Sequence, residues 1–145
     1  MKSLITLSLA AFAVSSSLQA GGHASEMQER MDLMSSIGKQ TRPLGQMARS
    51  GDVDWEAVAA AGANTSMVAE KFAELLVEGT YGAPGSANGA AIEANKDDIL
   101  AQLAALGETG AGLSAAAEAQ DVDAYKAAFG AYAGTCRSCH MAYRQ

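Results

Sequence analysis

Both cysteines of the chain and one of its two histidines lie within five consecutive positions near the C-terminal end. They are Cys136, Cys139 and His140, in the stretch TCRSCHMAYRQ. The order C-x-x-C-H is the attachment signature of c-type haem. Two thiols three residues apart lie on one side of a helical turn, where they can add to the two vinyl groups of one haem. The imidazole that follows can then bind the iron, so the pattern predicts haem c with His140 as its proximal ligand.

Three other interpretations of the two cysteines are weaker. A structural zinc site needs four ligands, and the only other histidine is His23, near the N-terminus. A thioredoxin-like C-x-x-C would follow a strand and open a helix, whereas this one lies late in an expected helix. A disulfide between Cys136 and Cys139 suits an oxidising compartment, but it leaves the adjacent histidine unexplained.

The first 20 residues have the pattern of a cleaved secretory signal peptide. Lys2 is followed by an apolar run over residues 4–14 and then by small and polar residues that end in Ala20. The run is too short for a membrane-spanning helix, which disfavours a membrane anchor. We expect cleavage after Ala20, with Ala24 as the alternative. This predicts a mature domain over residues 21–145, located in the periplasm and without a membrane span.

The charge of the chain disfavours nucleic acid as a partner. The formal net charge is −6 at pH 7, and loss of Lys2 with the signal peptide would make it −7. An acidic chain without a basic cluster is a poor match to a phosphate backbone. A positively charged protein partner is a better match.

Four segments of the chain show helical periodicity. They cover about residues 25–49, 54–77 and 90–119 and the stretch after Asp121, with a loop rich in glycine over residues 79–89. Pro43 should kink or interrupt the first segment. Three glycines in the third segment make a break or bend there plausible, and they are Gly107, Gly110 and Gly112. Asp121 is a candidate N-cap for the fourth segment.

The fourth segment has one continuous apolar face that also contains the chemical residues. Its positions step by three and four residues, and they are Val122, Tyr125, Phe129, Tyr132, Cys136, Cys139/His140 and Tyr143. Four amphipathic helices with mostly short connections predict an all-α fold. The architecture expected is an antiparallel up-down-up-down four-helix bundle with haem attached to the C-terminal helix.

Together these features resemble the class II c-type cytochromes, the cytochrome c′ family. The ending CHMAYR is similar to the family's C-H-x-x-Y-R, and RMDLM at 30–34 resembles part of its first helix. GDVD at 51–54, LVEGT at 76–80 and AQDVD at 119–123 resemble its turns and helix ends. One departure concerns the third helix. Members often have an Ile-Trp pair there, whereas Ile92 is followed by Glu93 and the only tryptophan is Trp55. One edge of the haem pocket could therefore be more open or more polar.

The resemblance implies that the residue at position 34 covers the distal face of the haem. Met34 is compatible with both branches of the family. In high-spin members this residue packs over the iron without bonding, and small gases such as nitric oxide or carbon monoxide can bind. In low-spin members a methionine ligates the iron, which suits electron transfer. The run Met34-Ser35-Ser36-Ile37-Gly38 is more like the Met-ligated relatives, which favours an electron carrier. Met31 is the alternative distal residue, and a plain core role for these methionines is the simpler alternative.

Other site residues and partners follow less directly. Arg30 and Arg144 are candidates to pair with the haem propionates, because arginine makes bidentate contacts to carboxylates. No histidine base or arginine-rich distal pocket is visible, so the sequence does not predict an enzyme. A bundle without cofactor, held by a disulfide, is the remaining alternative. The expected partners are periplasmic redox proteins and possibly small gases. The resemblance also implies a possible homodimer through the first two helices.

Overall fold

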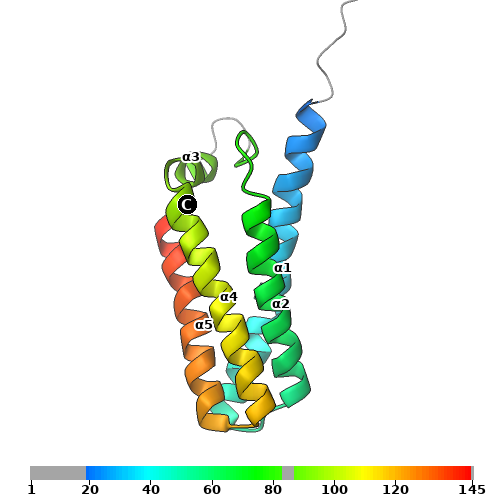
Figure 1. The fold of residues 1–145 in the computed structure, drawn as a ribbon, viewed down its shortest axis with the longest axis vertical. Coiled ribbons are helices and arrows are strands. Elements are labelled where there is room, and N and C mark those ends of the chain that lie inside the picture. Colours follow the sequence, from blue (N-terminus) through cyan, green and yellow to red (C-terminus); the bar gives the residue numbers. More distant parts are fainter. Residues whose placement is uncertain (1–18, 83–86, 145) are drawn as a thin grey trace, which may run out of the picture.

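The computed structural model describes residues 19–82 and 87–144, and this part of the chain is helical without any strand. Five helices follow one another: α1 (Gln19–Ser50), α2 (Trp55–Glu74), α3 (Ala87–Ala94), α4 (Lys96–Ala119) and α5 (Val122–Tyr143). The four long helices form the bundle, and α3 is a short helix at its upper end in Figure 1. Around the bundle, α1 packs on α2, α2 on α4, α4 on α5 and α5 on α1. The expected all-α four-helix bundle is confirmed.

Aspartate side chains begin two of the helices. Asp54 caps α2 by accepting a hydrogen bond from the backbone N–H of Ala57, over 3.0 Å. Asp121 caps α5 by accepting from the N–H groups of Asp123 and Ala124, over 2.9 and 3.0 Å. These bonds satisfy N–H groups that have no partner inside the helix. The cap predicted at Asp121 is confirmed.

The helix boundaries differ from the expected ones in two places. The first helix continues through Pro43 to Ser50 without interruption. The third expected segment is divided, but at Asn95 between α3 and α4 and not at its glycines. The helix α4 runs unbroken past Gly107, Gly110 and Gly112, because packing against α2 and α5 compensates for their low helix propensity. The predicted signal peptide covers residues 1–20, of which 1–18 lie outside the described residues.

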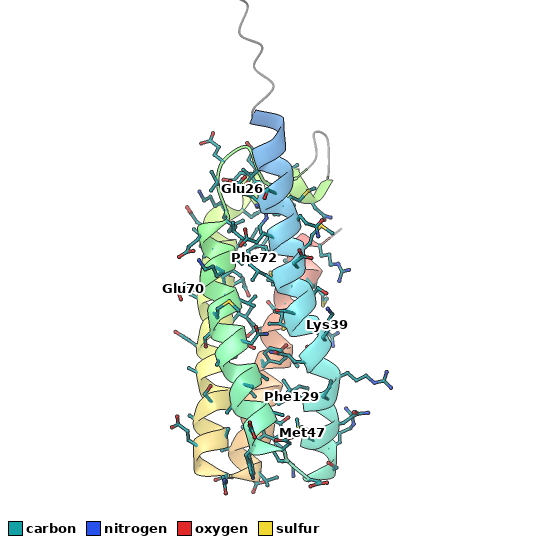
Figure 2. The ribbon with its side chains drawn as sticks, turned by 90° about the vertical axis from the view of Figure 1, so that its right-hand side faces the viewer. Glu26, Lys39, Met47, Glu70, Phe72 and Phe129 are labelled. Atoms are coloured by element: carbon teal, nitrogen blue, oxygen red, sulfur yellow. The ribbon has the colours of Figure 1, made fainter. Side chains whose placement is uncertain are left out.

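The core consists of two clusters of buried side chains. The lower cluster fills most of the bundle and comprises Ile37, Leu44, Val58, Ala61, Val68, Ala69, Leu106, Leu113, Ala116, Ala117, Tyr125 and Tyr132. The upper cluster lies towards the end of the bundle where α5 ends, and it comprises Leu76, Tyr81, Ile99 and Leu103. Phe129 packs against the lower cluster and Phe72 against the upper one, and both are labelled in Figure 2.

The spacing between α2 and α4 differs greatly from the spacing between α1 and α5. Between α2 and α4 the backbones nearly touch, since a Cβ atom added at Gly62 would lie 2.6 Å from the carbonyl oxygen of Gly110. Between α5 and α1, aromatic side chains span the interval. Phe129 lies against Gly45, where an added Cβ would be 3.1 Å from the phenyl ring. The bundle is therefore closed tightly by backbone contact on one side and held apart by side chains on the other.

Candidate functional site

The last turns of α5 position both thiols and the imidazole. Cys136, Cys139 and His140 all lie within this helix, and its backbone ends at Arg144, whose N–H donates to the carbonyl of His140 over 3.1 Å. The two thiols are half-buried and the imidazole is exposed. Residues three and four apart are neighbours on a helix surface. The helix therefore brings the three predicted residues together on one side of the bundle's upper half.

Burial shapes the surroundings of both thiols. Neither forms a disulfide. Burial raises the pKa of the Cys136 thiol, an effect that the neighbouring Tyr132 hydroxyl partly offsets. Burial also raises the pKa of Cys139, with a smaller contribution from the negative charge of Asp98. A pair of intact thiols is the form that can add to vinyl groups.

The spacing of these donors does not suit a small metal ion bound by all three. Among the described residues, no group of three or more His, Cys, Asp or Glu side chains could hold a metal ion. The thiols and the imidazole instead lie side by side along α5. Such a row fits a large planar group that the thiols hold at its edge while the imidazole reaches its centre. The donor set therefore fits haem c better than zinc.

Met34 on α1 contacts both core clusters. It is half-buried and packs against the lower cluster, as Cys136 does. It also packs against the upper cluster, as Tyr143 does. Met34 therefore shares one cluster with a residue of α5 that precedes His140 and the other cluster with one that follows it. Met31, one turn earlier, is 57% exposed.

Arg30 and Arg144 have very different surroundings. Arg30 is only 4% exposed, and its guanidinium donates to the carbonyl of Leu75 over 2.8 Å, to the hydroxyl of Thr80 over 3.1 Å and to the carbonyl of Thr80. Burial lowers the pKa of Arg30, while the negative charge of Glu26 opposes this change. Arg144 is exposed at the end of α5. The structure thus gives Arg30 a set of partners in the chain itself.

A polar network beside Cys136 is a feature that the sequence did not reveal. The hydroxyl of Tyr132 donates to the carbonyl of Ile37 over 3.1 Å and lies 2.8 Å from the hydroxyl of Thr41. The amide of Gln40 donates to the hydroxyl of Thr65 over 2.8 Å, which links α1 to α2. The only sequence signal was the position of Tyr132, four residues before Cys136 on the same helix face. The hydroxyl of Tyr132 therefore links the face of α5 that bears Cys136 to α1.

An aromatic row leads along α5 towards the thiols. Trp55 meets Tyr125 edge to face with ring centroids 6.2 Å apart, and Phe129 lies 6.5 Å from Tyr125 and 6.2 Å from Tyr132. Tyr125 and Tyr132 are fully buried, as the sequence predicted for core residues. The row fills the space between α5 and α1 in the lower half, and the next residue on the same face is Cys136.

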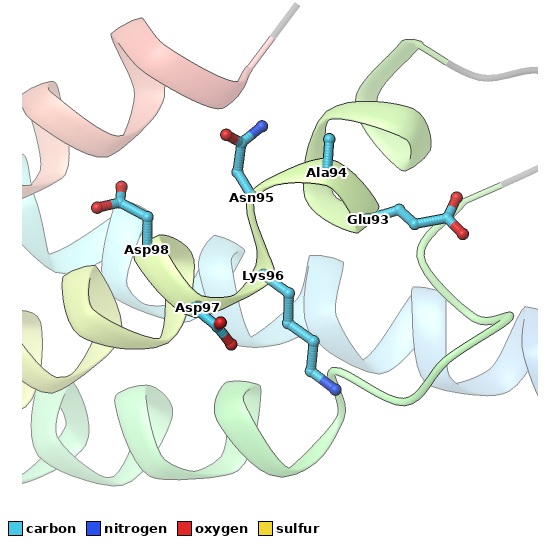
Figure 3. Close-up of a pocket in the computed structure, with 6 residues that line it drawn as sticks. All are labelled: Glu93, Ala94, Asn95, Lys96, Asp97 and Asp98. Atoms are coloured by element: carbon cyan, nitrogen blue, oxygen red, sulfur yellow. The ribbon is translucent and has the colours of Figure 1, made fainter.

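The junction of α3 and α4 is acidic and open. A shallow surface depression of about 300 Å³ is lined by the six residues from Glu93 to Asp98 (Figure 3). Asp98 lies on the side that faces α5, where it accepts a hydrogen bond from the Tyr143 hydroxyl. Glu93 is exposed, at the position where the sequence departs from the Ile-Trp pair.

An all-helical bundle that carries C-x-x-C-H in its last helix defines the c-type cytochromes of the four-helix class. A family model described as "Cytochrome C'" matches residues 25–144. The chain belongs to this family, and it is therefore a haem c cytochrome.

Comparison with solved structures gives the same fold. The chain is similar to the crystal structure of cytochrome c′ from Thermochromatium tepidum, with a TM-score of 0.73 and 21% sequence identity over 84% of this chain and 95% of that one. No curated protein matches the chain significantly. None of the helices in the described part of the chain has the length and apolarity that crossing a bilayer requires.

Proposed function

We propose that this cytochrome transfers single electrons in the periplasm. One haem would be attached through Cys136 and Cys139, with His140 as proximal and Met34 as distal ligand. Haem with His/Met ligation alternates between ferric and ferrous states at a raised potential. The observation that carries the proposal is the position of Met34. It packs with Cys136 in one cluster and with Tyr143 in the other, whereas Met31 is exposed.

The chain's own residues would perform four tasks in this function. The two thiols would hold the cofactor on α5, and the imidazole of His140 on α5 and the thioether of Met34 on the neighbouring α1 would be its two ligands. Tyr132 ties the attachment face to α1 through the carbonyl of Ile37. The propionates would be bound by Arg144 and by Arg30, which would have to divide its five N–H donors between them and the loop.

A gas-binding cytochrome is the second candidate. The observation in its favour is that Met34 packs against the apolar side chains of both core clusters. A residue that covers the iron without bonding to it would also be packed in this way. In that case nitric oxide or carbon monoxide would enter by displacing a packed side chain. We propose no catalysed reaction, since His140 is the only histidine beyond residue 23.

The first experiment compares optical spectra of the reduced protein with and without carbon monoxide at neutral pH. We expect the wild type to be low-spin and to change little with carbon monoxide. Met34→Ala should become five-coordinate and show a strong shift, because the only distal ligand is lost. Met31→Ala is the matched control, one turn away on the same helix, and should behave as the wild type. A strong shift in the wild type would overturn the electron-transfer proposal in favour of gas binding.

Attachment itself needs a separate measurement. Protein produced with a haem-attachment system should give the pyridine haemochrome spectrum of haem c and the mass of one haem. Substitution of both Cys136 and Cys139 by serine should abolish the covalent product. Absence of haem from the wild-type protein would overturn both candidate functions.

The location and partners are proposed on related grounds. Export would place the protein with periplasmic redox proteins, and cell fractionation tests this. Met31 and Met67, on α1 and α2, are exposed by 57% and 43%, which leaves apolar surface on the two helices through which a homodimer would form. Analytical ultracentrifugation of the mature protein measures the oligomeric state.

A further inference from the structure

Arg30 is a buried cation that binds the loop after α2. Its three acceptors are two backbone carbonyls and one hydroxyl, at Leu75 and Thr80. Thr80 also donates to the carbonyl of Val77 over 2.7 Å, so the loop forms a turn around the guanidinium. Burial of a charge costs several kcal/mol unless it is well hydrogen-bonded. A charge that the fold retains in such a place is a candidate for fixing a specific arrangement.

The arrangement that Arg30 fixes includes Met34. The two residues are four positions apart on α1, so they lie one turn apart on the same face. The acceptors of Arg30 are also next in sequence to two members of the upper cluster, against which Met34 packs. Leu75 precedes Leu76 and Thr80 precedes Tyr81. One guanidinium therefore joins the helix that bears Met34 to the loop that supplies two residues of this cluster.

We propose that Arg30 is a positioning residue for Met34. Its hydrogen bonds to Leu75 and Thr80 hold α1 in register with the loop, so that the thioether is kept at the level of His140 on α5. This inference rests on the proposed function, in which Met34 ligates the iron. Without the hydrogen bonds, α1 is free to shift relative to the upper cluster, and Met34 yields the distal position more readily to an added ligand.

The test uses the holoprotein and two readouts of Met34. One is the charge-transfer band of ferric haem ligated by methionine, and the other is the affinity of the ferrous protein for carbon monoxide. Arg30→Gln should weaken the band and raise the affinity on the order of tenfold, as expected from the loss of hydrogen bonds to a charged group. Thr80→Val removes a single acceptor and should act in the same direction but less. Arg42→Gln, an exposed arginine on the same helix, is the matched control and should change neither readout.

A double-mutant cycle separates positioning from a general structural effect. In the Met34→Ala background there is no distal ligand to displace, so Thr80→Val, which keeps the guanidinium and removes one of its acceptors, should leave the carbon monoxide affinity unchanged. An equal change in both backgrounds would overturn the inference. The cycle of Thr80→Val with Met34→Ala decides the role of Arg30 even if the Arg30→Gln protein does not fold.

The two proposals can fail separately. A wild-type protein without methionine ligation overturns the proposed electron-transfer function, and this inference with it. A Met-ligated wild type whose band and affinity are unaffected by Arg30→Gln and Thr80→Val overturns only the role of Arg30.

Discussion

At the residue scale, two tyrosines of α5 do more than fill the core. Tyr125 donates from its hydroxyl to the carbonyl of Leu44 over 2.6 Å, and Tyr132 donates to that of Ile37 over 3.1 Å. Both rings are fully buried, and their polar tips find acceptors on α1, as buried tyrosines usually require. Each residue thus supplies apolar area and a directional contact between the same two helices.

Tyr125 should make the protein sensitive to alkaline pH. Burial raises its pKa from 10.0 to about 12, so the folded protein holds this proton more tightly than the unfolded chain. The stability that this provides is complete below pH 10 and is lost as the pH rises through 12. Tyr125→Phe should cost about 1 kcal/mol at neutral pH through the lost hydrogen bond. It should also reduce the steepness of the alkaline loss.

Urea unfolding of both proteins at several pH values measures this effect. Tyr132, whose pKa burial also raises, remains in both proteins and contributes equally. Identical slopes for the wild type and Tyr125→Phe above pH 10 would contradict the assignment.

A site residue can be predicted from the sequence when the pattern that reveals it lies within one short stretch of the chain. The spacing of Cys136, Cys139 and His140 is a local pattern, so the sequence alone is enough to propose an attachment site there. The partners of Arg30 do not, because two of them are backbone carbonyls that any sequence would supply, 45 and 50 residues away. Helical spacing alone left both Met34 and Met31 open as distal residues. The resemblance to the family favoured Met34, and the structure adds that Met31 is exposed.

At the element scale, the glycines of α4 are packing residues. Gly110 faces Gly62 of α2, and a Cβ at Gly110 would lie 2.7 Å from the carbonyl oxygen of Gly62 and 2.8 Å from the backbone nitrogen of Ser66. Ser66 donates to the carbonyl of Gly107 over 3.1 Å at the same crossing. The break or bend that these glycines suggested was wrong, since helix propensity is a weak signal that tertiary packing overrides.

Alanine at either crossing glycine should destabilise the bundle. Gly62→Ala and Gly110→Ala place a methyl group against backbone atoms, which cannot move as a side chain does, and we expect losses of about 1–3 kcal/mol. Gly130→Ala is the matched control. It lies within α5, is exposed and has open space around its Cβ position, so alanine should stabilise by up to about 1 kcal/mol.

Thermal unfolding of the three variants checks both directions of change. Equal effects at all three glycines would mean that helix propensity, and not the close crossing, determines their contribution.

At the scale of the whole molecule, the acidic charge is the most general property. The net charge of −6 at pH 7 and the carboxylates between Glu93 and Asp98 give a surface that attracts cations. Asp98 is bonded to Tyr143 of α5, so part of this charge lies near the attachment site. Long-range attraction of this kind accelerates encounter with a positively charged partner.

Electron exchange should therefore be faster with a cationic small redox complex than with an anionic one of similar potential. Raising the ionic strength should slow the first reaction and accelerate the second, because salt screens exposed charges. Stopped-flow rates at several salt concentrations test this. Replacing Asp97 and Asp98 by asparagine should reduce the salt dependence for the cationic complex. Rates that do not depend on salt would mean that charge does not guide the encounter.

The unequal spacing within the bundle has a consequence for protein engineering. Where α2 and α4 meet at Gly62 and Gly110, an added Cβ atom collides with backbone, so this crossing tolerates little redesign. The interval between α1 and α5 is occupied by replaceable side chains, among them Phe129 and Tyr132. New cofactor environments can therefore be designed by substituting side chains on the facing sides of α1 and α5, while α2 and α4 are kept unchanged.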